Sequence, residues 1–252
     1  MRLLTTSILA AALALTAAAA ERSGKGRTFA DRVVKTPSVV YLKGFHSATQ
    51  RGPTCNVYSA WMILRYYKFH ITPTQIKQGS RDGAYKTSKF IEEKLDAINF
   101  SFLVYHPKQG TDFADVVKVC IDNGIPLQWG VNLKYAPGVR PPRRNTRDGG
   151  HARVIWGYER DRHTGEVKRI IFADSWGRGA LRKKIEVDEA CHMTMSMSPV
   201  FPRDTDREVV AKLMAIPGMQ QGDIPDPPDG GPARKPDKRP PRPPRKKKRD
   251  AK

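Results

Sequence analysis

The spacing of apolar residues in the first half of the chain predicts helices. Residues 54–69 follow Pro53, a residue favoured at helix starts, and form the first of them. Its apolar positions recur every three or four residues and make one stripe, which comprises Val57, Ala60, Trp61, Leu64 and Tyr67 or Lys68. Further helices are predicted over residues 87–98 and 111–123, and the second of these ends before Gly124, as helices commonly do.

Short apolar runs in the second half predict strands instead. These runs cover residues 127–133, 151–159, 166–174 and, more weakly, 180–187. Helices followed by strands are typical of an α+β protein with segregated lobes. We expect a helical part at about residues 45–125 and a β part at about 126–200, within one domain of residues 21–221.

The two ends of the chain differ from this domain. Residues 1–20 have a basic start, an apolar middle and a final run of alanines, which is the pattern of a secretory signal peptide. A membrane anchor is the alternative, although the run is barely long enough to span a bilayer. Residues 222–252 are rich in Pro, Lys and Arg, which indicates a disordered tail. We therefore expect a protein that is secreted or periplasmic after cleavage.

The chain is strongly basic, with a net charge of +20 from 45 Lys and Arg against 25 Asp and Glu. The tail contributes +6 of this charge, so most of it lies on the predicted domain. Basic surfaces attract anionic polymers, and we expect the tail to contact an anionic envelope polymer or a membrane surface. Specific nucleic-acid binding is not expected from such a polybasic end.

The cysteines exclude some classes of protein and suggest another. With three cysteines and no Cys-x-x-Cys pair, the chain fits neither a disulfide-stapled miniprotein nor the usual structural zinc site. Cys55 stands at the start of the first predicted helix, where the positive end of the helix dipole favours the nucleophilic thiolate. A buried structural cysteine is the alternative interpretation.

Two further candidates lie before and after this helix. Gln50 precedes Cys55 by five residues, so its amide and a backbone N–H at the helix start can form a donor pair for a developing oxyanion. The alternative for Gln50 is a solvated loop residue. His151 opens a predicted strand directly after Gly150, and glycine there lets the backbone turn and leave the histidine at a rim.

The strand that His151 opens and the strand after it predict a β-hairpin. If the polar turn is centred at residues 162–163, His151 lies directly opposite Asp174, with about 5 Å between their Cβ atoms. Asp174 then holds one imidazole nitrogen and leaves the other for Cys55. The three residues would act as nucleophile, base and orienter. This prediction depends on the register, because a slip of one residue moves the pair to opposite faces.

Together these residues resemble the papain-like cysteine peptidases. Those enzymes have a Gln ahead of a Cys-x-x-aromatic-Ser helix, a His that starts a strand, and an Asn-Ser-Trp-Gly sequence. The corresponding positions here are Gln50, residues 55–59, His151 and residues 174–177. The shorter chain, the spacing from Gln to Cys and the Asp in place of Asn are similar to bacterial relatives of the bacteriocin-processing C39-type peptidases. The similarity covers roughly residues 45–180.

The resemblance implies a papain-like fold, in which a helical lobe carrying Cys55 faces a β-sheet lobe carrying His151 across a cleft. It implies Cys55 as the nucleophile, His151 as the base and Asp174 as the orienter. Gln50 would be the oxyanion donor. The implied activity is hydrolysis of a peptide or protein substrate through a thioester, without a cofactor or a metal.

The resemblance also implies residues of the substrate cleft. Trp176 would shield the His–Asp pair from water. Asn56 stands where papain has an aromatic residue, which would change the acyl pocket, and Gly150 would lie at the cleft edge. Two other readings of the same fold stay open: an acyltransferase that passes the thioester to an amine, and a catalytically silent, basic envelope-binding protein.

The two remaining cysteines are Cys120 and Cys191. In an oxidising compartment they can form a disulfide, which would leave Cys55 as the odd thiol. The alternative is that each is simply buried.

Overall fold

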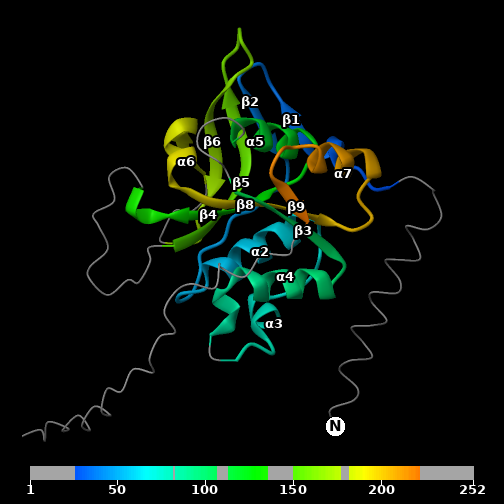
Figure 1. The fold of residues 1–252 in the computed structure, drawn as a ribbon, viewed down its shortest axis with the longest axis vertical. Helices are drawn as coiled ribbons and strands as arrows, with labels where there is room; N and C mark the ends of the chain where they lie inside the picture. Colours follow the sequence, from blue (N-terminus) through cyan, green and yellow to red (C-terminus); the bar gives the residue numbers. More distant parts are fainter. Residues whose placement is uncertain (1–25, 82, 107–112, 136–149, 177–181, 222–252) are drawn as a thin grey trace, which may run out of the picture.

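The structure, a computed structural model, describes residues 26–81, 83–106, 113–135, 150–176 and 182–221 (Figure 1). The predicted signal peptide and the predicted tail lie outside these residues. Within the described ranges, nine strands pair into one antiparallel sheet. No helix in this part of the chain is long and apolar enough to cross a membrane.

The elements alternate along the chain more than the sequence predicts. The strands are β1 (Val33–Lys35), β2 (Val39–Leu42), β3 (Phe100–Tyr105), β4 (Leu127–Asn132), β5 (Gly150–Arg160), β6 (Val167–Ala173), β7 (Lys183–Glu186), β8 (Thr194–Pro202) and β9 (Met219–Gln221). The α-helices are α2 (Cys55–Tyr66), α3 (Pro73–Lys77), α4 (Ser88–Ala97), α5 (Phe113–Asp122), α6 (Val187–Met193) and α7 (Arg207–Met214). Short 3-10 helices are η1 (Ala30–Arg32), η2 (Ala84–Lys86) and η3 (Leu133–Tyr135).

The long strand β5 is the centre of the sheet. Along the main path the strand order is β1-β2-β5-β4-β8-β3-β9, and β6 pairs with β5 and with β7. The first half of β5 pairs with β4, its second half pairs with β2, and β6 pairs with it from Val154 onward. His151 at the start of β5 is therefore fixed within a multistranded sheet.

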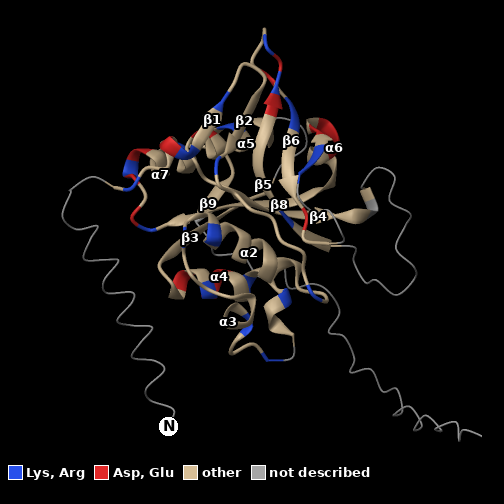
Figure 2. Ribbon diagram, turned by 180° about the vertical axis from the view of Figure 1, so that it is seen from behind, with Lys and Arg blue, Asp and Glu red and all other residues tan. Residues whose placement is uncertain are grey.

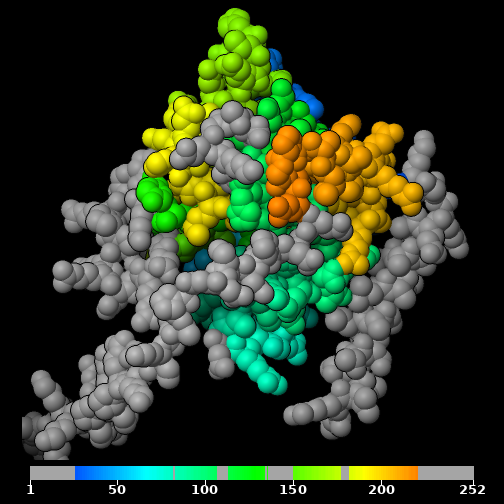
Figure 3. All heavy atoms as spheres, viewed as in Figure 1, coloured from blue at the N-terminus to red at the C-terminus, as the bar shows by residue number. Residues whose placement is uncertain are grey.

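The helices divide between two lobes, which gives the predicted α+β class. Helices α2, α3 and α4 form the lower lobe in Figure 1, and α5, α6 and α7 lie with the strands in the upper lobe. The space-filling view shows the same division, with cyan and teal segments below and yellow and orange segments above (Figure 3). Charged residues occur along the chain in both lobes (Figure 2).

The boundary between the lobes differs from the prediction. Strand β3 lies within the part expected to be helical, and α5 packs on strands β5, β2 and β6 and on helices α6 and α7 of the upper lobe. Five of the six residues of β3 are buried, and its sequence is an apolar run interrupted by Ser101. Such a run does not show the alternation that identifies a half-buried strand.

Helix α2 belongs to the lower lobe and packs against the sheet. It contacts β5 on one side and α3 and α4 on the other. Residues on most sides of the helix are therefore buried, and these are Val57, Ser59, Ala60, Met62, Ile63, Leu64 and Tyr66. The prediction of a single apolar stripe is wrong on this point: Trp61, placed on that stripe, is only partly buried and donates its indole N–H to the Ile71 carbonyl at 2.7 Å.

The other predicted elements are present with small shifts. The predicted helices correspond to α2, α4 and α5, and the predicted strands correspond to β4, β5, β6 and β7. Residues 111–112 and 180–181 of these predictions lie outside the described residues. Among the strands and α-helices, the sequence did not predict β1, β2, β3, β8, β9, α3, α6 or α7, most of which are short or rich in polar residues.

The predicted register of the β5–β6 hairpin is wrong by two residues. Val154 pairs with Ala173, so the next step along both strands brings Arg153, not His151, alongside Asp174. The turn is centred one residue later than predicted, because the Asp161 carboxylate accepts the backbone N–H groups of the turn residues at 163 and 164. The two irregularities in the β5–β6 pairing, between Ile155 and Gly157 and between Glu159 and Arg160, shift the register in opposite directions and leave no net change at Val154.

Candidate active site

Cys55 is the first residue of α2, directly after the helix cap at Thr54. Burial raises the pKa of the Cys55 thiol. Hydrogen bonds from the His151 side chain and from the backbone N–H groups of Ala152 and Asn56 lower it, as does the positive charge of the imidazolium. The net result is a pKa below the ordinary value for a thiol, which increases the fraction of the nucleophilic thiolate.

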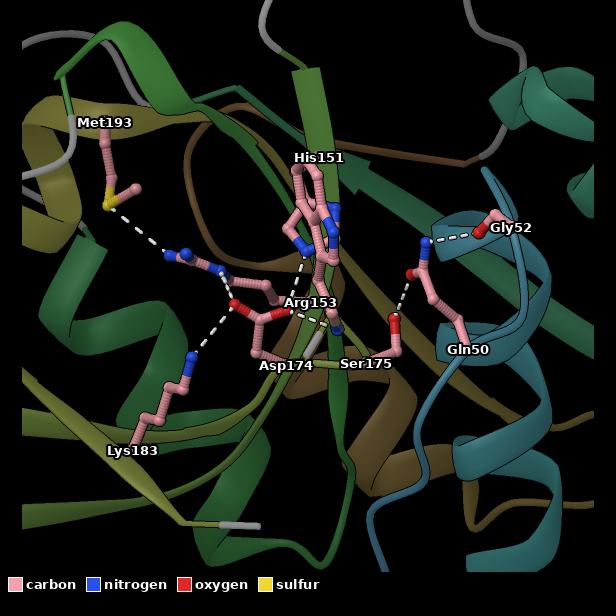
Figure 4. Close-up of polar contacts among 9 residues, drawn as sticks. Gln50, Gly52, His151, Arg153, Asp174, Ser175, Lys183 and Met193 are labelled. Atoms are coloured by element: carbon pink, nitrogen blue, oxygen red, sulfur yellow. Dashed lines mark hydrogen bonds and ion pairs between the residues drawn. The ribbon is translucent and has the colours of Figure 1, made fainter. Parts of the chain in front are cut away.

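His151 lies between Cys55 and Asp174. Its Nε2 is 2.7 Å from Asp174 Oδ1, and only 3% and 5% of the two side chains are exposed (Figure 4). Because Asp174 occupies Nε2, the Nδ1 atom is left for the thiol. Burial lowers the pKa of His151, but hydrogen bonds with Asp174 and Cys55 and the charges of both raise it above its ordinary value. The opposite shifts favour a thiolate–imidazolium pair.

Asp174 follows the end of β6 and accepts hydrogen bonds at both oxygens. Its Oδ1 accepts from His151 and, at 2.9 Å, from the backbone N–H of Trp176. Its Oδ2 lies 3.1 Å from Arg153 Nε and 3.5 Å from Lys183 Nζ (Figure 4). Burial raises the pKa of Asp174, but the His151 hydrogen bond, the nearby positive charges and the Trp176 N–H hold it well below its usual range. The orienting group is therefore a fixed carboxylate.

Gln50 is held against the segment that carries Asp174. The Ser175 hydroxyl donates to Gln50 Oε1 at 2.6 Å, and the Gln50 backbone N–H donates to the Ser175 carbonyl at 2.7 Å. Gln50 Nε2 donates one hydrogen to the Gly52 carbonyl at 2.7 Å (Figure 4). Because the amide oxygen is occupied by Ser175, the side-chain orientation is fixed, and the second N–H of Nε2 remains for another acceptor.

Trp176 packs against the imidazole and is open to solvent on its other side. Its ring centroid lies 5.2 Å from that of His151, and the Trp176 side chain is 58% exposed. The indole therefore covers part of a histidine that is itself almost fully buried.

These residues surround one cleft of about 890 Å³. Its lining includes Gln50, Cys55, Asn56, Gly150, His151 and Trp176, whereas Asp174 lies behind the imidazole. Asn56 donates to the Lys86 carbonyl at 2.5 Å and accepts from Gln128 at 3.4 Å, so it connects α2 to η2 and β4. The structure thus brings together every residue that the sequence analysis assigned to the site and cleft.

Arg153 and Lys183 also belong to the site, and neither was predicted from the sequence. Arg153 stands two residues after His151, and this spacing places both side chains on one face of a strand, which was an available signal. Lys183 reaches Asp174 through the pairing of β7 with β6, where Lys183 lies opposite Phe172. That pairing has no local sequence signal.

The other two cysteines are not joined. Cys120 and Cys191 are both free thiols, so the structure does not contain the disulfide considered as one alternative. Cys120 is fully buried in α5, and burial raises the pKa of its thiol. Cys191 is partly exposed on α6.

Comparison with known proteins gives one family and several distant structures. The profile of the Peptidase_C39 like family matches residues 39–197. The peptidase domain of Streptococcus ComA, a bifunctional ABC transporter involved in quorum sensing, has a TM-score of 0.46 and 11% identity, covering 62% of this chain and 97% of that chain. No curated protein gives a significant match.

Two further structures are similar at the same level. A double-glycine-motif protease from an AMS/PCAT transporter, in complex with its leader peptide, has a TM-score of 0.41 and 14% identity, covering 72% of this chain and 96% of that chain. A C39-like peptidase from Bacillus anthracis has a TM-score of 0.43 and 14% identity, covering 64% of this chain and 96% of that chain. These similarities are too distant to transfer any residue role.

Proposed function

Because the chain belongs to the Peptidase_C39 like family, whose members are cysteine peptidases of papain-like fold, we propose that it is an exported peptidase acting through Cys55, His151 and Asp174. One observation carries this proposal. A thiol at a helix N-terminus contacts a buried imidazole whose other nitrogen is held 2.7 Å from a buried carboxylate, at an open cleft. This is the arrangement that activates a cysteine nucleophile.

The reaction follows from the protonation state of the pair. The Cys55 thiolate attacks the carbonyl carbon of a bound peptide, and the electron pair of the carbonyl moves to its oxygen. As the C–N bond breaks, protonated His151 gives its proton to the leaving amine, and a thioester to Cys55 remains. Water then attacks the thioester, neutral His151 accepts its proton, and the acid product leaves with the thiolate restored.

The oxyanion of each tetrahedral intermediate needs fixed donors. The second N–H of Gln50 Nε2 is suited to this role, because Ser175 and Gly52 fix the amide before substrate binds. The backbone N–H of Cys55 at the start of α2 is the second candidate donor, since the first N–H groups of a helix have no partner within the helix. Donors fixed in advance stabilise the developing charge without reorganisation.

Asp174 and Trp176 act on His151 rather than on the substrate. Asp174 fixes the ring so that Nδ1 faces the thiol, and its charge stabilises the imidazolium. Trp176 lies over the ring and limits the access of water to the His151–Asp174 hydrogen bond. A hydrogen bond is stronger where water is excluded.

The substrate class follows from the family, and the location from the chain ends. An open cleft of about 890 Å³ suits an extended segment of a peptide or protein substrate. The signal-peptide pattern of residues 1–20 supports export to the periplasm or the exterior. The basic composition of residues 222–252 supports contact with an anionic envelope polymer or membrane surface.

A cleavage assay tests the proposal. The purified protein is incubated with a diverse peptide library with and without a primary amine, and products are identified by mass spectrometry. We expect hydrolysis that is lost in Cys55→Ala and His151→Ala and retained in Cys191→Ala, which removes a thiol outside the cleft lining. Products that form only by transfer to the amine would show an acyltransferase. Binding of anionic polymer without any reaction would show a silent envelope protein.

A further inference from the structure

A buried arginine contacts the carboxylate behind the imidazole. Arg153 is only 8% exposed, and its Nε lies 3.1 Å from Asp174 Oδ2. Its guanidinium carbon lies 4.9 Å from the ring centroid of Phe172 and 5.5 Å from that of Trp129. Its NH1 group faces Met193 Sδ at 3.9 Å (Figure 4). Two aromatic rings and a sulfur thus fix the side chain in one position.

This contact changes the charge of the orienting group. Arginine stays protonated in proteins, so Arg153 and Asp174 together carry no net charge. Asp174 Oδ1 serves His151 while Oδ2 serves Arg153, and the two roles use different oxygens. Lys183, at 3.5 Å from Oδ2 and with 43% of its side chain exposed, adds a second and more weakly coupled positive charge.

We propose that Arg153 is a positioning residue, whose guanidinium fixes Oδ2 and offsets part of the charge of Asp174, so that the carboxylate orients His151 without holding its proton too tightly. The consequence for catalysis rests on the proposed function. An unbalanced carboxylate would hold the proton on His151 more tightly, and the imidazolium must release that proton to the leaving amine. Arg153 thus lets Asp174 fix the orientation of the imidazole without an excess of negative charge beside it.

The charges that face His151 come from several elements. Cys55 faces it from α2 and Asp174 from the end of β6. Arg153 lies on the same strand, and Lys183 reaches the same carboxylate from β7. On β4 and β8 the neighbours that line the cleft are uncharged, and they are Gly130, Val131, Met195 and Ser196. Of the two cations that the structure describes beside Asp174, Arg153 is the buried one and Lys183 is exposed.

The test uses thiol alkylation, which needs no peptide substrate. The rate at which iodoacetamide alkylates Cys55 is measured against pH, in a Cys120→Ala/Cys191→Ala background. Loss of a positive charge favours the protonated forms of Cys55 and His151. We therefore expect Arg153→Met to move the titration to higher pH by about one unit.

Matched variants separate charge from packing. Lys183→Met, at an exposed side chain, should move the profile in the same direction by less and should leave the fold intact. Arg153→Lys should keep the wild-type profile, because the charge remains. Arg203→Met removes a surface arginine paired with Asp96, and its profile should not move. Wild-type profiles in both Arg153→Met and Lys183→Met would overturn the proposal.

A double mutant tests neutralisation directly. Asp174→Asn leaves Arg153 buried without its partner, and Arg153→Met leaves Asp174 without its buried counter-charge. With both changes, an uncharged amide can hold His151 with no buried cation. We expect the double variant to titrate at nearly the wild-type pH, because the two charges that it lacks cancel, whereas Asp174→Asn alone moves the profile to lower pH and Arg153→Met alone moves it to higher pH. A double variant displaced from the wild-type profile as far as either single variant would contradict the proposal, and peptide cleavage, measured separately, would judge the proposed function.

Discussion

Asp174 Oδ1 lies 2.7 Å from His151 Nε2, and both side chains are almost completely buried. Water therefore has little access to this hydrogen bond. The other ring nitrogen of His151, Nδ1, is left for Cys55. In a site of this kind the carboxylate sets the orientation of the ring and stabilises its charged form.

Removing the carboxylate should reduce turnover more than binding. We expect Asp174→Ala to lower kcat by about 100-fold to 10,000-fold with a small change in KM, because Asp174 lies behind the imidazole and outside the cleft lining. Steady-state kinetics on a cleaved peptide measure both constants. Asp204→Ala is the control, because this variant removes a carboxylate that pairs with Arg27 and does not line the cleft. Full activity in Asp174→Ala would refute its role as the orienter.

The amide of Gln50 should contribute to the transition state. Gln50→Ala should lower kcat by about 100-fold to 1,000-fold, the usual cost of removing one oxyanion donor. Ser175→Ala should have a smaller effect in the same direction, because the hydroxyl only fixes the amide through the 2.6 Å hydrogen bond. Thr49→Ala changes the exposed neighbour of Gln50 and should have no effect. A Ser175 effect larger than that of Gln50 would contradict this order.

The pH dependence of kcat/KM should be bell-shaped and wide. The thiolate–imidazolium pair forms as pH rises through the lowered pKa of Cys55 and is lost as pH rises through the raised pKa of His151. Asp174 stays ionised across this range, because its own pKa is held well below its usual range.

Asp174→Asn separates the two groups in the same experiment. Without the carboxylate charge, the pKa of His151 falls, so the alkaline side of the profile should move to lower pH. An alkaline side that moves upward would contradict the assignment of the His151 charge to Asp174.

The sequence predicts local features of this site well. Cys55 at a helix start and His151 at a strand start follow from patterns of a few residues each, and the α+β class follows from the order of elements. The contact between His151 and Asp174 survives a wrong register, because a shift of two residues keeps both side chains on one face of the sheet.

Other features depend on contacts between distant segments. The position of the turn at Asp161 decides that Arg153 lies alongside Asp174. Lys183 joins the site only because β7 adds to the edge of β6. The burial of α2 on most sides depends on which elements pack around it, so the sequence of the helix alone does not reveal it.

The backbone conformation and close packing at Gly124 can be tested by substitution. This residue has φ of +77°, and an added Cβ would lie 2.5 Å from the Phe29 carbonyl oxygen. Gly44 has a similar φ of +79° with nothing near its Cβ position, so it isolates the cost of the backbone angle. Gly44→Ala should cost about 1 kcal/mol of unfolding free energy, and Gly124→Ala should cost clearly more because of the clash. Urea unfolding measures both, and equal costs would show that the N-terminal segment moves freely away from Gly124.

The nucleophile is the central claim, and covalent labelling tests it most directly. The protein is treated with an irreversible thiol-directed peptidyl inhibitor, and the intact mass and the modified peptide are determined. We predict one adduct, on Cys55, that is absent in a folded Cys55→Ala variant, much slower to form in His151→Ala and unchanged in Cys191→Ala. Equal labelling of Cys55→Ala, or an adduct on Cys191 in place of Cys55, would contradict the account.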